Sequence, residues 1–103
     1  MLPYHTYYRL TRRRLPMAAE VKPIDPENRA WVSVYPQHDG SYVVHYFEIL
    51  SETIESGYDF DGDALKHERK IRELHDDSLE MGILQFLDDP EQLMPTHASD
   101  FPL

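Results

Sequence analysis

Two runs of β-branched and aromatic residues, separated by a turn sequence, constrain the fold of this chain most strongly. The first run is Trp31–Tyr35, the second is Tyr42–Ile49, and the segment Pro36–Gly40 between them ends in Asp-Gly. β-Branched and aromatic residues favour strands, and Asp-Gly favours a tight connection between antiparallel strands. The sequence therefore predicts an antiparallel hairpin over about residues 30–50.

The side chains of this hairpin alternate between two apolar faces. A four-residue loop would pair Val34 with Val43 and Tyr35 with Tyr42. We expect the core face to carry Val32, Val34, Val43, Phe47 and Ile49. The other face carries Trp31, Tyr35, Tyr42, Val44 and Tyr46. That second face is too aromatic for ordinary surface, so it is either covered by an N-terminal strand over Tyr4–Leu10, which we favour, or exposed as an interface.

After residue 61 the apolar spacing changes to one that is typical of helices. A first stripe, at spacings of three and four, consists of Ala64, His67, Ile71, Leu74, Ser78 and Met81. A second stripe consists of Leu79, Ile83, Phe86 and Leu87. The rotation between the stripes predicts two helices, at about 62–75 and 78–88, the second capped by Asp77 with Glu80. Between hairpin and helices, Thr53–Glu55 is compatible with a third strand.

The expected fold is thus α+β, a small antiparallel sheet packed against two C-terminal helices. The length of 103 residues suits one domain. We expect residues 1–16 to be a basic N-terminal arm or extra strand, 17–90 a single α+β domain, and 91–103 a C-terminal tail. Translation from Met17 is an open alternative, in which residues 1–16 would be an upstream extension.

The distribution of charge suggests a kind of partner. Residues 1–22 carry five basic side chains and one acidic one, a net charge of +4, whereas residues 23–103 carry five basic and 18 acidic ones, a net charge of −13. An acidic body repels phosphates, so nucleic acid binding is unlikely except through Arg12, Arg13 and Arg14. We expect a basic protein partner.

The composition limits the kinds of chemistry and the cellular location that we expect for the protein. The chain has no cysteine, which excludes thiol nucleophiles, disulfides and Cys-ligated metals. No apolar run is long enough to span a membrane, and the apolar segment that an export signal needs after Arg12–Arg14 is missing. We expect a cytoplasmic protein with no membrane association.

Two acidic clusters flank the first predicted helix and are the candidate partner-binding residues. They consist of Asp59, Asp61, Asp63, Asp76, Asp77 and Glu80. The first three resemble the start of a calcium loop, but Ala64 and Lys70 stand where the loop needs glycine and glutamate. The histidines lack the spacing of a zinc pair. We therefore expect no metal and no cofactor.

The sequence contains no motif that names a reaction. The leading hypothesis is a small acidic, non-enzymatic protein-binding module of the inhibitor, immunity or adaptor type. One alternative is a subunit of a homo-oligomer or larger assembly that uses the aromatic hairpin face. Another is a metal-dependent enzyme or calcium binder that uses Asp59, Asp61 and Asp63.

Overall fold

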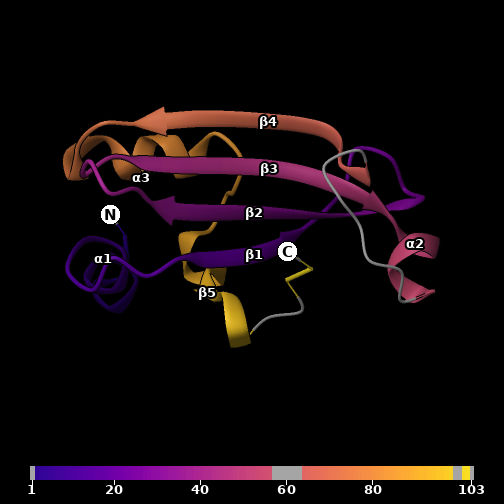
Figure 1. The fold of residues 1–103 in the computed structure, drawn as a ribbon, viewed down its shortest axis with the longest axis horizontal. Coiled ribbons are helices and arrows are strands. Elements are labelled where there is room, and N and C mark those ends of the chain that lie inside the picture. The colour runs from indigo at the N-terminus through magenta and orange to yellow at the C-terminus, as the bar shows by residue number, and fades with distance from the viewer. Residues whose placement is uncertain (1, 57–63, 99–100, 103) are drawn as a thin grey trace.

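The protein is an α+β domain built on one antiparallel sheet. The computed structural model describes residues 2–56, 64–98 and 101–102 (Figure 1). Five strands lie in the order β4-β3-β2-β1-β5, which confirms the expected fold class. The strands are β1 Met17–Val21, β2 Asn28–Pro36, β3 Tyr42–Leu50, β4 Lys66–Glu73 and β5 Met94–Pro95. The helices are α1 Tyr4–Thr11, α2 Ser51–Glu55 and α3 Asp76–Leu84, with short 3-10 turns η2 at Pro90–Gln92 and η3 at Thr96–Ala98.

The predicted hairpin is confirmed as β2 and β3, but its register is shifted by one residue. Val34 pairs with Val44 and Tyr35 with Val43, because the loop has five residues rather than four. The Asp39 carboxylate stabilises this longer loop by accepting hydrogen bonds from the backbone N–H and hydroxyl of Ser41. The shift places Tyr42 and Tyr46 of β3 on the face that carries Val34, and Phe47 on the opposite face.

Both sheet faces are consequently covered by the chain itself. One face packs under α1 and α3, and its core includes Val32, Val34, Tyr42, Val44, Tyr46, Leu79 and Ile83. On the other face Trp31, Phe47 and Ile49 pack with Ile54, Leu65 and Phe101. The expected division of hairpin faces was wrong, because a one-residue slip reverses which side chains share a face.

The first segment is a helix, α1, and not the expected strand. Leu2, Thr6 and Leu10 are four residues apart, so in a helix they share one face, and all three are buried. Tyr4, by contrast, is 81% exposed. The spacing of these buried residues explains why residues 4–11 are helical.

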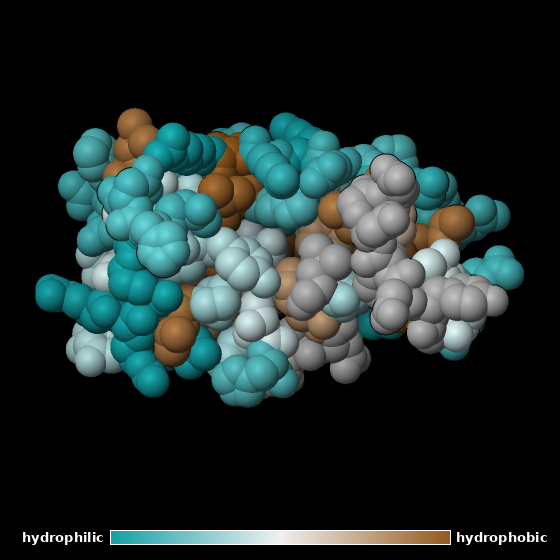
Figure 2. Space-filling model, viewed as in Figure 1, coloured by the Kyte–Doolittle hydropathy of each residue, from teal (hydrophilic) through white to brown (hydrophobic). Residues whose placement is uncertain are grey.

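The prediction of a helix at about 62–75 is also wrong for the part of this segment that the structure describes. Residues 66–73 form β4, which pairs with β3 at the edge of the sheet. This strand is mostly charged, and Figure 2 shows many hydrophilic side chains along the upper edge, where β4 lies. Edge strands carry charges because charges discourage pairing with other chains. Leu74, a member of the first predicted helical stripe, is 58% exposed.

The C-terminal elements follow the prediction more closely. α3 begins at Asp76, two residues before the predicted start, and Asp77 lies inside it rather than acting as its cap. The possible strand at Thr53–Glu55 is instead part of α2. Beyond α3 the chain returns to the sheet, where Met94 pairs with Ala18.

A buried carboxylate fixes the connection between β1 and β2. Glu48 is fully buried and accepts hydrogen bonds from the backbone N–H groups of Ile24 and Asp25, from the Asn28 amide and from the Tyr46 hydroxyl. Burial raises the pKa of Glu48, but these four donors outweigh it, so the pKa lies below its ordinary value. Glu48 therefore stays charged and anchors the loop.

Candidate binding cleft

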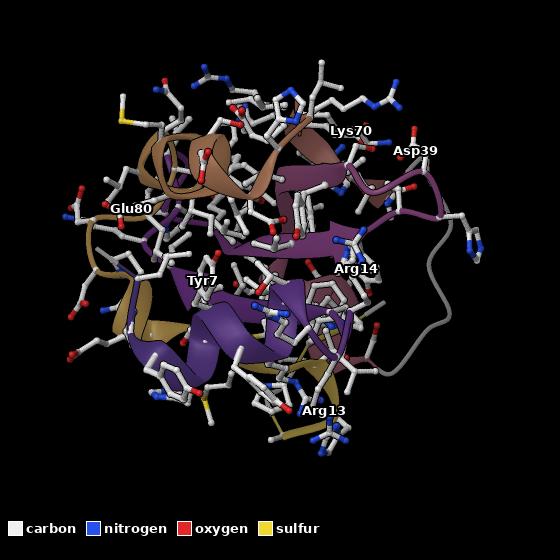
Figure 3. All side chains as sticks on the ribbon, turned by 90° about the vertical axis from the view of Figure 1, so that its left-hand side faces the viewer. Tyr7, Arg13, Arg14, Asp39, Lys70 and Glu80 are labelled. Carbon is white, nitrogen blue, oxygen red and sulfur yellow. The ribbon has the colours of Figure 1, made fainter. Side chains whose placement is uncertain are left out.

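A cleft of about 630 Å³ opens between α1 and the beginning of α3. Figure 3 looks onto this end of the molecule, with Tyr7 on α1 and Glu80 on α3. The residues that line the cleft are Leu2, Tyr4, Tyr7, Asp76, Asp77, Glu80 and Met81. One wall is thus aromatic and apolar, and the other carries three carboxylates.

The acidic wall is positioned by the first turns of α3. Asp76 and Asp77 occupy the first turn, and Glu80 follows them by one turn on the same side. Carboxylates at this end of a helix are stabilised by its dipole, by about 0.3–1 kcal/mol each. This local effect explains why acids are tolerated here, although it does not explain why they line a cleft.

A residue of the sheet, Tyr42, also fixes the position of Asp76. The Tyr42 hydroxyl, from β3, donates a hydrogen bond to its carboxylate. Burial, together with the hydrogen bond to the neighbouring Asp76 carboxylate, raises the pKa of Tyr42 to about 12. Tyr42 therefore remains a hydrogen-bond donor at neutral pH and fixes the start of α3.

The aromatic wall is positioned by α1. Burial of Leu10 and Thr6 orients the helix, which leaves Tyr4 and Tyr7 on the cleft side. The rings of Tyr4 and Tyr8 stack with centroids 6.2 Å apart. This stacking extends the aromatic wall along α1, away from the cleft.

Arg14 fastens the end of this segment to the hairpin loop. Its guanidinium donates hydrogen bonds to the backbone carbonyls of Gln37, at 2.7 Å, and Ser41, at 3.2 Å. The same guanidinium lies 4.6 Å from the ring centroid of Tyr42. Since Tyr42 also binds Asp76, a continuous series of contacts connects the two walls of the cleft.

The remaining arginines of this segment are differently placed. Arg12 and Arg13 are exposed, and neither makes an ion pair with the residues that the structure describes. Arg12 lies beside Tyr4, Tyr7 and Tyr8 on the outer side of α1. Of the three arginines considered for nucleic acid binding, Arg14 is thus engaged within the fold and the other two face outward.

The cleft has the chemistry to hold an organic cation. Carboxylates attract an ammonium or guanidinium group, and tyrosine rings add cation–π attraction. The apolar side chains of Leu2 and Met81 can contact the aliphatic part of a lysine or arginine side chain. The lining residues therefore fit the side chain of a basic residue better than a free inorganic cation.

The structure brings together half of the predicted partner-binding residues. Asp76, Asp77 and Glu80 lie on one wall of the cleft. Asp59, Asp61 and Asp63 lie outside the described residues, as does the possible calcium loop that they would form. Sequence reasoning missed Tyr4 and Tyr7, because it assigned residues 4–10 to a strand. The four-residue spacing of Leu2, Thr6 and Leu10 was the signal that could have found them.

Other kinds of site are not evident in the described part of the chain. No group of three or more His, Asp or Glu side chains there is arranged to hold a metal ion. Among the same residues, no helix has the length and apolarity that crossing a bilayer requires. Comparison with family models, with curated proteins and with solved structures found no match.

Proposed function

We propose that this protein is a non-enzymatic binding module that engages a basic segment of a partner protein. A lysine or arginine side chain of the partner enters the cleft between α1 and α3. The observation that carries this proposal is the juxtaposition of Asp77 and Glu80 with the tyrosines of α1 across one cleft. A protein of the inhibitor, immunity or adaptor type would use such a cleft to recognise its target.

The charge of the whole chain supports the same kind of partner. The net charge is −9, and all of the acidic excess lies beyond residue 22. Such an excess speeds association with a basic surface, and salt weakens the effect. We further propose a cytoplasmic location, whose reducing conditions are compatible with a chain that has no cysteine.

Assembly through the aromatic hairpin face is not part of this proposal. Tyr42, Val44, Tyr46 and Trp31 are all buried within the chain itself. Only Tyr35 of that set is partly exposed, at 36%. The face that suggested a homo-oligomer is therefore occupied by the protein's own core.

The test is the binding of a short lysine-rich peptide, measured by fluorescence anisotropy at about 50 mM and about 300 mM salt. The double variant Asp77→Asn/Glu80→Gln removes two charges from the cleft while preserving the shapes of the side chains. We expect it to weaken binding about tenfold or more.

The matched control is Glu52→Gln/Glu55→Gln, which removes the same charge from exposed positions on α2. We expect this control to change affinity less than about threefold, since exposed charges away from the contact act only through long-range attraction. Equal losses in both variants would show that binding depends on net charge and not on the cleft.

A further inference from the structure

The outer surface of α1 continues directly from the cleft, whose acids lie on α3, and becomes basic toward the end of α1. Tyr4 and Tyr7 line the cleft, and the same two residues lie beside Tyr8 and Arg12 on the outer side of the helix. Arg12 follows Tyr4 by eight residues, a distance of about 12 Å along a helix. Acids, exposed tyrosines and arginines therefore succeed one another on one surface (Figure 3).

We propose that a second copy of this chain binds this surface, and that Arg12 and Arg13 of each copy enter the acidic cleft of the other. The inference rests on the proposed function, because it names the basic segment that fills the cleft when no other partner is present. The resulting dimer has two-fold symmetry, with the α1 helices antiparallel across the axis.

Two-fold symmetry follows from the order of the chemical groups. An interface between identical copies needs a surface that is complementary to itself after a half-turn. A half-turn about an axis near Tyr8 places the basic end of α1 in one copy against the acidic cleft of the other. It also brings the tyrosines of both copies together at the centre. An arrangement with like ends in contact would instead set carboxylates against carboxylates.

The residue types and their exposure suit such a contact. Tyr4, Tyr7 and Tyr8 are 81%, 38% and 46% exposed, respectively. Tyrosine and arginine are enriched at protein interfaces, where tyrosine contributes a large contact area with little loss of side-chain entropy. Met81, on the cleft side, is also 65% exposed, and it adds apolar surface at each end of the contact.

The net charge of −9 on each copy opposes association at long range. Charges more than about 8–10 Å apart are largely screened at physiological salt, whereas the opposite charges at the contact lie closer than that. A contact built mainly from one short helix on each side is small, so we expect a weak dimer whose fraction depends on protein concentration.

Sedimentation equilibrium at protein concentrations up to about 500 µM tests the proposal. The variants are Arg12→Glu/Arg13→Glu and Asp77→Lys/Glu80→Lys, with folding of each checked by circular dichroism. Each variant alone sets like charges against each other twice per dimer, so we expect its dimer dissociation constant to rise at least tenfold. An equimolar mixture restores attraction at both ends, so we expect a heterodimer within about threefold of the wild-type affinity.

The matched control is Lys22→Glu/Lys66→Glu, which changes net charge as the arginine variant does but at exposed positions away from α1. It should dimerise within about threefold of the wild type. A wild-type chain that stays monomeric, a mixture that restores nothing, or a control that dissociates equally would overturn the proposed dimer. Peptide binding by a monomeric chain would leave the proposed function standing while the dimer fails. A chain that dimerises but binds no peptide would show the reverse, because the dimer would stand while the proposed function fails.

Discussion

The hydroxyl of Tyr42 donates a hydrogen bond to the carboxylate of Asp76, and this contact joins the centre of the sheet to the first turn of α3. The ring of the same tyrosine is covered by the guanidinium of Arg14, which follows α1. Tyr42 is fully buried, whereas Asp76 is exposed and lines the cleft. One side chain of β3 thereby sets the spacing between the two walls of the cleft.

The substitution Tyr42→Phe removes the hydrogen bond to Asp76 and keeps the ring beneath Arg14. Hydrogen bonds to charged groups contribute about 1.5–3 kcal/mol, so we expect the free energy of unfolding to fall by an amount in that range. Urea denaturation monitored by circular dichroism measures it. The control Tyr35→Phe, on a partly exposed ring, should change stability by less than about 0.5 kcal/mol. Equal effects of the two substitutions would contradict the role given to Tyr42.

Stability should fall at alkaline pH because of two tyrosines. Burial together with Asp76 raises the pKa of Tyr42 to about 12, and burial together with Glu48 does the same for Tyr46. An unfolded tyrosine titrates near pH 10, so the stabilisation is complete below about pH 10 and is lost as pH rises through the folded value. Urea unfolding between pH 9 and 12 should show a loss of about 2 kcal/mol per tyrosine that the variant Tyr42→Phe/Tyr46→Phe lacks. Parallel pH profiles would refute this assignment.

The substitution Glu48→Gln tests the buried anchor of the β1–β2 connection. Glutamine keeps the shape of the side chain but loses the charge, and its NH2 group meets N–H donors where an acceptor is needed. We expect a loss of about 2–4 kcal/mol in the free energy of unfolding. Because the pKa of Glu48 lies below its ordinary value, wild-type stability should also fall below about pH 4.5, and the variant should lose less over that range. The exposed Glu52→Gln is the control, and a similar loss there would argue against the anchor.

The substitution Gly82→Ala tests the packing of α3 beneath β4. Gly82 is buried, and a Cβ atom added there would lie 2.6 Å from Cγ of Glu73. Alanine favours a helix by about 1 kcal/mol over glycine, but this contact must be relieved, so we expect a net destabilisation of about 1–2 kcal/mol. In the background Glu73→Ala the same substitution should stabilise the protein, as thermal unfolding of the four chains would show. Destabilisation of equal size in both backgrounds would exclude the predicted clash.

The sequence was sufficient to predict the hairpin and the α+β class, because both depend on local residue preferences. It was insufficient for β4, where Lys66–Glu73 combines charged residues with helix-like spacing. Pairing with β3 decides the conformation of that segment, and a single sequence does not reveal a pairing partner. The predicted register of the hairpin was wrong by one residue, because the hydrogen bonds of Asp39 stabilise a loop that is one residue longer.

One wall of the candidate site could be predicted, namely Asp76, Asp77 and Glu80, because a cluster of acids is visible in the sequence. The opposing aromatic wall could not be predicted, because the cleft exists only once α1 packs beside α3. Tyr4 belongs to that wall and lies more than seventy residues from Asp77 in the sequence. Only the tertiary fold places the two residues beside each other.

The most direct test of the cleft is a ¹H–¹⁵N NMR titration of the protein with a short lysine-rich peptide. We expect the largest chemical-shift changes on residues of α1 and on the first turns of α3, centred on Tyr7, Asp77 and Glu80. We also expect Asp77→Asn/Glu80→Gln to abolish most of those changes at the same peptide concentration. Changes centred on another surface, or spread evenly over the acidic residues of the chain, would contradict binding at the cleft.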